Sequence, residues 1–219
     1  MRTDPAARRS FYTRLLVLEW GLGLVTLVVW AAAPRVGAAQ VGLVLPQRWP
    51  GPFTWLACAV LLALVLLSTR TLRSGALAGP PPEALRPNRP GEARHAEPPG
   101  HATLALLPRS RAERRLFGVV GLTAGVCEEW LYRGFFLAVV GALLPGLPTV
   151  LLVLVAALAF GLAHAYQGRT GILTTGVLGG VLAGLYLSTG SLLLPVLLHA
   201  AIDLRFLLVP PSALPAAAR

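Results

Sequence analysis

The chain has 219 residues, of which 55% are apolar and only 13% are charged, and its mean hydropathy is +0.69. A soluble domain carries charge on roughly a quarter of its residues, so this composition argues against a cytosolic enzyme, a disordered chain and a coiled coil. The net charge of +10 comes from arginine, since the sequence contains no lysine. The arginines cluster beside apolar runs, as at the ends of membrane helices. We therefore expect the lipid bilayer as a partner, and no nucleic acid.

Two apolar runs open the chain, at residues 14–33 and 53–69. The first contains Glu19 and is followed by Pro34. Both have about the length that crosses the hydrocarbon core of a bilayer as a helix. We predict that residues 1–69 form an N-terminal two-helix membrane hairpin, retained as an anchor and not cleaved as a signal peptide.

A polar stretch follows the two runs. Residues 70–115 contain eight of the 19 prolines, nine arginines and four glutamates. This composition predicts a Pro/Arg-rich cytoplasmic linker over 70–114, poorly ordered over 79–101.

Apolar character returns from Leu116 onward, with seven charged residues in the last 104. Proline and glycine divide this block into four predicted helices at about 115–144, 148–166, 170–188 and 191–209. We predict an all-α, polytopic transmembrane helical bundle of about six spans, with a membrane domain at 115–209 and a tail at 210–219. The 115–144 stretch is long for one crossing, so we expect it to tilt or to begin outside the hydrocarbon core.

The arginine distribution predicts the orientation. The N-terminal tail and the linker are rich in arginine, whereas the loop between the first two helices has Arg35 and Arg48 only. An even number of spans with both termini in the cytoplasm satisfies this bias. We expect a multi-pass protein of the plasma membrane.

Six acidic or histidine residues fall within the predicted spans: Glu19, Glu128, Glu129, His164, His199 and Asp203. Taken singly, a histidine in a membrane helix is usually a hydrogen-bonded packing residue. Glu19 lies near Arg14, and we interpret it as a residue near the membrane surface. Taken together, the other five place polar faces on three helices, and lipid drives such faces toward one another.

Helical spacing pairs several of these residues. Glu129 and Arg133 are four residues apart and share a helix face, so an ion pair can neutralise this carboxylate. Glu128 points about 100° away from Glu129 and has no local partner. It needs a proton, a metal or donors from another helix. His199 and Asp203 are also four residues apart, and Asp203 can hold the imidazole in one orientation.

A carboxylate that faces two imidazoles suggests either a base that activates water or a His/His/Glu zinc site. Both lead to amide hydrolysis, and a proton relay in a transporter is the alternative. The chain lacks H-E-x-x-H, G-x-G-D and G-x-S-G, which disfavours the zinc, aspartyl and rhomboid-type intramembrane proteases that carry those motifs.

Three motifs occur in order on successive apolar segments. Glu128 to Arg133 fits E-E-x-x-x-R, Phe160 to His164 fits F-x-x-x-H, and His199 to Asp203 fits H-x-x-x-[N/D]. In this arrangement the region 115–208 resembles the CPBP (CAAX protease and bacteriocin-processing, or Abi) family, which is related to the type II CAAX prenyl endopeptidases. The first two runs and the linker carry none of the resemblance.

The resemblance implies a helical membrane fold and an intramembrane endopeptidase that acts on a protein or peptide substrate. It implies that Glu128 activates water, that His164 helps to hold it, and that His199 and Asp203 stabilise the oxyanion. Glu129, Arg133 and Phe160 would support them. Asp203 stands where many relatives have asparagine, and an ionised aspartate only accepts hydrogen bonds.

The resemblance leaves the cofactor open. Zinc on Glu128, His164 and His199 and metal-independent glutamate chemistry are both compatible with it. A catalytically silent membrane scaffold, a bacteriocin-immunity-type protein and a proton-coupled transporter are the alternative functions. A shared site requires Glu128 to lie within about 10 Å of a site histidine, because catalytic partners act directly or through one water.

Overall fold

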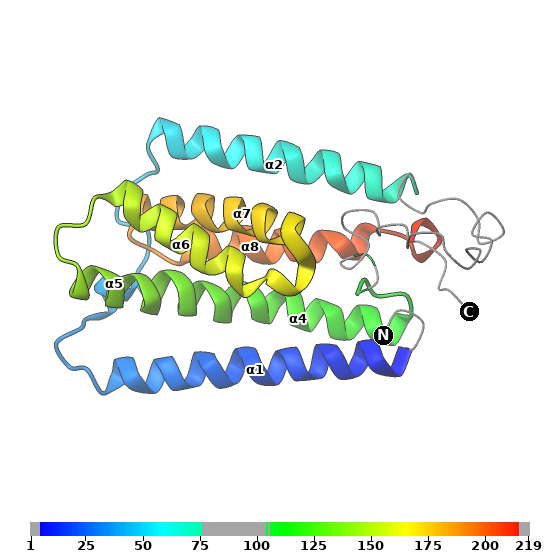
Figure 1. Ribbon diagram of the computed structural model, residues 1–219, viewed down its shortest axis with the longest axis horizontal. Coiled ribbons are helices and arrows are strands. Elements are labelled where there is room, and N and C mark those ends of the chain that lie inside the picture. Colours follow the sequence, from blue (N-terminus) through cyan, green and yellow to red (C-terminus); the bar gives the residue numbers. More distant parts are fainter. Residues whose placement is uncertain (1–4, 76–103, 105, 215–219) are drawn as a thin grey trace, which may run out of the picture.

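The computed structural model describes residues 5–75, 104 and 106–214, and this part of the chain is helical without a β-strand. Six helical columns run lengthwise through the bundle in alternating directions (Figure 1). They are α1 (Pro5–Ala31), α2 (Pro52–Arg73), α4 (Arg111–Glu129) with its continuation, α6 (Thr149–Ala163), α7 (Gly168–Thr189) and α8 (Leu193–Leu204). The continuation of α4 is a π-helical turn, Trp130–Phe136, followed by α5 (Leu137–Leu143).

The helix ends follow local sequence signals. Ser110 and Glu113 form a reciprocal capping box at the start of α4, which satisfies backbone N–H groups that have no intrahelical partner. Pro52 occupies the first turn of α2, where its missing N–H costs nothing. Gly190 ends α7 in the left-handed conformation, at φ +69°. The column from Arg111 therefore begins four residues earlier than predicted, because its cap lies in the linker.

Within the described part of the chain, three helices are long and apolar enough to cross a membrane: Pro5–Ala31, Pro52–Arg73 and the column Ala165–Thr189. The shorter α6 has 15 residues and α8 has 12, which correspond to about 22 and 18 Å of helix. The first part of α4 carries too many charged residues to qualify by composition. The all-helical membrane architecture agrees with the sequence, whereas the count of six spans remains a prediction.

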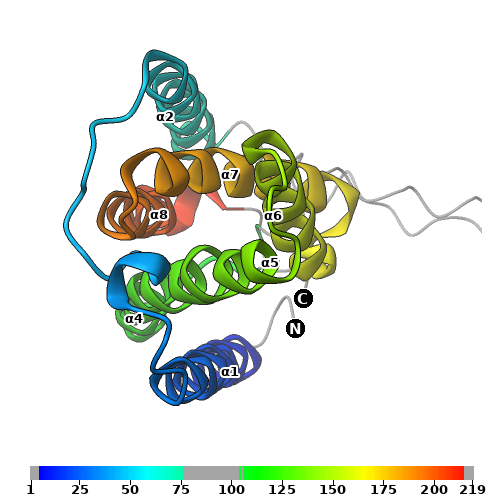
Figure 2. The same cartoon turned by 90° about the vertical axis from the view of Figure 1, so that its left-hand side faces the viewer.

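The two N-terminal helices lie on opposite sides of the bundle, with α4 to α8 between them (Figure 2). Helix α1 packs on α4, and α2 packs on α7. This differs from the hairpin expected over residues 1–69. The connection from Ala32 to Gly51 is long enough to cross the end of the bundle, and its Val41 is buried in the core with Trp130 and Tyr186.

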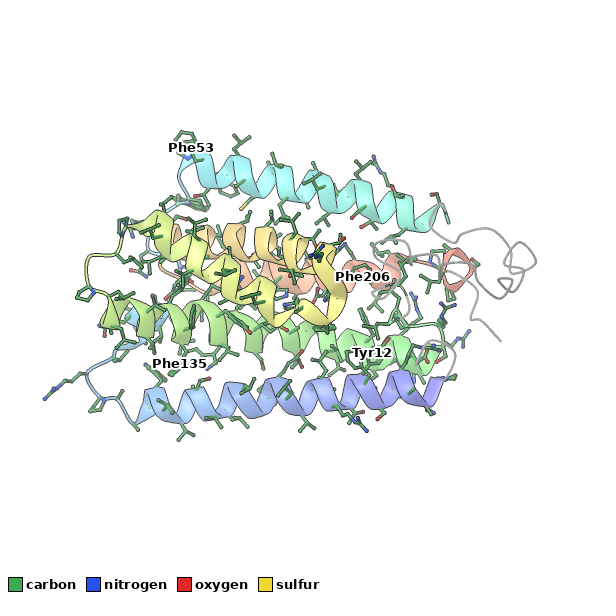
Figure 3. All side chains as sticks on the ribbon, in the orientation of Figure 1. Tyr12, Phe53, Phe135 and Phe206 are labelled. Carbon is green, nitrogen blue, oxygen red and sulfur yellow. The ribbon has the colours of Figure 1, made fainter. Side chains whose placement is uncertain are left out.

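Helices α1 and α4 run parallel in a constant register. Arg8 contacts Glu113, Tyr12 contacts Phe117 and Gly23 contacts Cys127, each pair being 104 or 105 positions apart. The Tyr12 hydroxyl also donates to the Leu106 carbonyl, and Figure 3 shows Tyr12 on α1 at the end of the bundle where α4 begins. This register fixes which α1 residues face the centre of the molecule.

Lipid is the natural environment of the outer surface. Only 6% of the most apolar windows of α1 and of α2 is buried, and large apolar side chains cover both helices. Exposed apolar surface on this scale is typical of a membrane protein and not of a soluble monomer.

The end of the linker belongs to the folded part of the chain. Leu104 and Leu107 are buried in a cluster with Leu72 and Val209. The stretch predicted to be poorly ordered, 79–101, lies outside the described residues.

Candidate active site

The centre of the bundle holds a buried ion pair on the α4 column. Glu129 is fully buried, and its Oε1 atom accepts a hydrogen bond of 2.8 Å from Arg133 Nη1. Arg133 is also fully buried, and its Nη2 atom donates to the Gly179 carbonyl of α7 at 3.1 Å. The guanidinium lies 4.4 Å from the centre of the Phe160 ring. The predicted i,i+4 pair therefore ties the α4 column to α6 and α7.

His199 of α8 meets the same carboxylate. Its Nδ1 atom lies 2.7 Å from Glu129 Oε1, and the residue is 3% exposed. Asp203, expected to orient this imidazole, lies 3.7 Å from Nε2, beyond good hydrogen-bonding distance. The hydrogen-bonded partner of His199 is therefore Glu129, and Asp203 lies on the other side of the ring. Glu129 and His199 are 70 positions apart, so helical spacing could not indicate the contact.

A close approach of α4 and α8 makes this contact possible. A Cβ atom added at Gly125 would lie 2.9 Å from the Ala200 Cβ and 3.0 Å from the Ala200 nitrogen. Only glycine fits so near to another helix backbone. Glu129 lies one turn after Gly125, and His199 directly precedes Ala200. The close approach of α4 and α8 at Gly125 and Ala200 therefore places the side chains of Glu129 and His199 within hydrogen-bonding distance.

His164 and Glu128 face each other at the end of α6. The Nε2 atom of His164 lies 3.9 Å from Glu128 Oε2, and its Nδ1 atom lies 2.9 Å from the Phe160 carbonyl. Because a carbonyl only accepts hydrogen bonds, Nδ1 carries the proton. In the neutral ring Nε2 is then an acceptor directed at the Glu128 side. The 3.9 Å separation is well within the 10 Å limit set for a shared site.

The Phe160 ring lies between the two histidines. Its centre is 4.6 Å from the His164 ring, 5.8 Å from the His199 ring and 5.1 Å from the Tyr132 ring. The residue is 1% exposed. Phe160 therefore separates the imidazoles and covers the guanidinium of Arg133 with apolar surface.

The site has an inner and an outer layer. The side chains of Glu129 and Arg133 are fully buried and that of His199 is 4% exposed. Those of Glu128, His164 and Asp203 are 17%, 14% and 30% exposed. The outer three can be reached from outside the protein, while the inner three hold them in place. One oxygen of Glu128, Oε2, has no hydrogen-bond partner among the described residues.

The arrangement does not fit the zinc site considered above. Among the described residues, no three His, Cys, Asp or Glu side chains are grouped to hold a metal ion. The Nδ1 atom of His199 bonds to Glu129, and its Nε2 atom faces Asp203 and not Glu128 or His164. A zinc site needs three protein ligands at about 2.0–2.2 Å around a common point.

Glu19 is a buried acid that the sequence interpretation undervalued. It is 6% exposed in the seam between α1 and α4, and neither carboxyl oxygen has a hydrogen-bond partner among the described residues. A location near the membrane surface does not account for this burial. Its spacing from Tyr12 and Gly23 on one helix face was the available signal, but the partner of that face was unknown.

The fold and site define a helical membrane protein with a buried Glu-Arg-His centre and an outer Glu-His pair. Residues 112–205 match the family model described as type II CAAX prenyl endopeptidase Rce1-like. The match covers under half of the chain and supports a CAAX/CPBP-family protease, a family that implies membrane protease activity. The match spans all three motifs and ends two residues after Asp203. Searches of curated proteins and of solved structures found no match.

Proposed function

We propose that this protein is an intramembrane endopeptidase in which Glu128 activates the water that attacks a peptide bond. The observation that carries the proposal is the Glu128–His164 pair. A separation of 3.9 Å is too long for a direct hydrogen bond and suits one water that bonds to both atoms. Glu128 accepts the proton of this water as the general base, and His164 Nε2 accepts its second hydrogen bond.

His199 is proposed to stabilise the negative charge that develops on the carbonyl oxygen. The Glu129 bond at Nδ1 fixes the ring, and in the imidazolium form the Nε2–H is a donor for the oxyanion. Asp203 lies on the Nε2 side and supports this positive charge. The proton taken by Glu128 then passes to the leaving amine, so the peptide bond is cleaved without net transfer to the protein.

The orientation is proposed from the ends of the bundle. The start of α1 and the last described turn, Pro211–Ala213, lie at the same end in Figure 1. Arg8 lies in the first turn of α1, and Arg109 and Arg114 lie at the start of α4, which is packed beside it. We propose that this end faces the cytoplasm of a plasma-membrane protein with six crossings, which satisfies the positive-inside bias. A cysteine introduced at Ser212 would be labelled from the cytoplasmic side only, and labelling from outside would contradict this orientation.

The direct test uses the full chain, purified and reconstituted in lipid vesicles, with a library of fluorescence-quenched peptides and one membrane-anchored substrate. Glu128→Gln is expected to reduce kcat/KM by about 10²–10⁴-fold, because the amide cannot accept the proton. His164→Ala is expected to reduce it by about 10²-fold.

Glu113→Gln is the matched control. It makes the same acid-to-amide change on the same helix, in the buried pair with Arg8 at 2.9 Å. We expect it to lower the unfolding stability and to retain activity wherever the protein is folded. Full activity of folded Glu128→Gln protein would refute the proposed base. If wild type cleaves nothing while Glu128→Gln retains the cellular phenotype, the scaffold or immunity function is favoured instead.

A further inference from the structure

The imidazole of His164 lies at the point where a helix ends. His164 follows the last residue of α6, with φ −97° and ψ 17°, and the three-residue turn Ala165–Gln167 separates it from α7. Two of its contacts come from one turn earlier on the same helix, the ring and the carbonyl of Phe160. Because the backbone leaves the helix at His164, helical geometry alone does not fix the imidazole beside Glu128.

A third contact of this imidazole comes from the turn that follows. The ring centre of Tyr166 lies 5.8 Å from that of His164, with an angle of 32° between the ring planes. The side-chain amide of Gln167 donates to the Tyr166 hydroxyl at 3.1 Å. Tyr166 is still 55% exposed, so its own turn does not enclose the ring, and a further partner is needed to hold it.

That further partner of Tyr166 belongs to α1. The ring centres of Phe11 and Tyr166 are 6.4 Å apart, with an angle of 56° between the planes, a geometry within the range of favourable aromatic pairs. The turn between α6 and α7 stops short of the end of the bundle at which α1 begins (Figure 1). Helix α1 therefore extends past this turn and reaches it with Phe11, a residue of its second turn.

Phe11 projects from a part of α1 that is fixed to α4. Its neighbour Tyr12 is 1% exposed, and the ring centres of Tyr12 and Phe117 are 5.6 Å apart. Arg8, about one turn earlier, forms the buried ion pair with Glu113. Phe11 is thus held in place relative to α4, the helix that also carries the proposed base.

We propose that Tyr166 and Phe11 are positioning residues that hold the His164 imidazole beside Glu128, Phe11 by contact with Tyr166 and Tyr166 by contact with His164. The proposal rests on the proteolytic function proposed above. It makes α1, which lies outside the region matched by the family model, a functional part of the site. Neither aromatic ring takes part in bond cleavage.

Kinetics with the quenched peptides test whether the rings are needed. Tyr166→Leu removes both ring contacts and is expected to lower kcat about tenfold with KM within about twofold. Tyr166→Phe keeps the ring and is expected to retain kcat within about twofold, and Phe11→Leu is expected to lower kcat about threefold. Phe53→Leu is the matched control, because Phe53 of α2 is 86% exposed and distant from α1 (Figure 3), and we expect it to leave kcat unchanged.

Double variants test whether each ring acts through the next. Phe11→Leu is expected to cause no further loss of kcat in Tyr166→Leu protein, and Tyr166→Leu none in the residual activity of His164→Ala protein. Additive losses in either pair would overturn the positioning role. Equal losses in Tyr166→Phe and Tyr166→Leu would also overturn it, because they assign the effect to the hydroxyl. A higher KM with unchanged kcat would do so too, since it indicates direct binding of substrate.

Histidine NMR separates this proposal from the proteolytic function. The full chain in lipid nanodiscs carries ¹³C in the rings of its four histidines, and the His164 signal is assigned by its loss in His164→Ala. Among the described residues Phe11 has ring contacts with Tyr12 and Tyr166, so an effect of Phe11→Leu on His164 is expected to pass through Tyr166.

Phe11→Leu is expected to shift the His164 signal, and Phe53→Leu to leave it unchanged. An unshifted signal in folded Phe11→Leu protein refutes the proposal even where peptides are cleaved. If wild type cleaves no peptide but the shift is observed, proteolysis fails and the support of His164 by α1 stands.

Discussion

Replacing Arg133 by methionine tests the organisation of the site most sharply. The substitution keeps a similar length and removes the guanidinium that bonds to Glu129 at 2.8 Å and to the Gly179 carbonyl at 3.1 Å. It also removes the cation over the Phe160 ring. The Glu129 carboxylate would remain buried, with His199 as its one partner among the described residues.

Breaking a buried ion pair by removal of one partner costs about 3–5 kcal/mol. The lost hydrogen bond to the Gly179 carbonyl corresponds to about 1.5–3 kcal/mol and the lost ring contact to about 0.5–2 kcal/mol, but these effects are not additive. We expect Arg133→Met to lower the unfolding free energy by about 3–5 kcal/mol, a large share of the roughly 5–15 kcal/mol of a typical domain. Glu129→Gln combined with Arg133→Met removes both charges and should recover about 2 kcal/mol or more of the loss.

The assay is unfolding in mixed micelles with increasing SDS, followed by tryptophan fluorescence. Trp130 lies directly after Glu129, in the core, and reports on this region. A loss below about 1 kcal/mol in Arg133→Met would refute the reasoning. So would a double variant that is less stable than the sum of the two single losses, since it would show that the charges do not stabilise each other.

Gly125→Val is expected to push α8 away through Ala200 and to reduce activity by at least tenfold, measured with the quenched peptides. Gly184→Ala is its control, because an added Cβ there meets nothing within 4 Å, and equal activity of both variants would contradict the close-contact argument. Phe160→Ala is expected to lower the unfolding free energy by about 3–5 kcal/mol, with Phe160→Leu less damaging, and similar losses in SDS unfolding would contradict the packing role. Chelators are expected to leave the activity unchanged because the site does not group three metal ligands; loss on chelation and recovery with zinc would refute this.

The sequence predicted the helices and part of the site because both depend on local signals. Apolar runs bounded by proline or glycine correspond to α6, α7 and α8 within a few residues. The Glu129–Arg133 pair follows from helical spacing, and it is present. The proximity of Glu128 and His164 followed from the cost of unpaired polar groups in lipid. Each of these inferences uses either the residue spacing within one helix or the general tendency of polar side chains to avoid lipid.

The remaining features depend on how helices cross, which spacing along one helix does not specify. The contact of Glu129 with His199 requires α4 and α8 to approach at Gly125. In the structure α1 and α2 flank the bundle and do not form the expected hairpin. This arrangement depends on α1 packing against α4, where Arg8 forms an ion pair with Glu113. The burial of Glu19 follows from that same register.

Glycine contacts explain why these polar groups meet at all in a bundle surrounded by lipid. Without a hydrophobic force between helices, close packing and polar contacts must hold them together. An added Cβ at Gly179 would lie 2.9 Å from the Phe160 Cβ, and the Gly179 carbonyl accepts from Arg133. Gly125 has the same relation to α8, next to His199. Glu129, Arg133 and His199 therefore lie at levels where helices approach closely, and their hydrogen bonds also fix two helix crossings. Loss of either the small residue or the charge is expected to separate the catalytic groups before it unfolds the bundle.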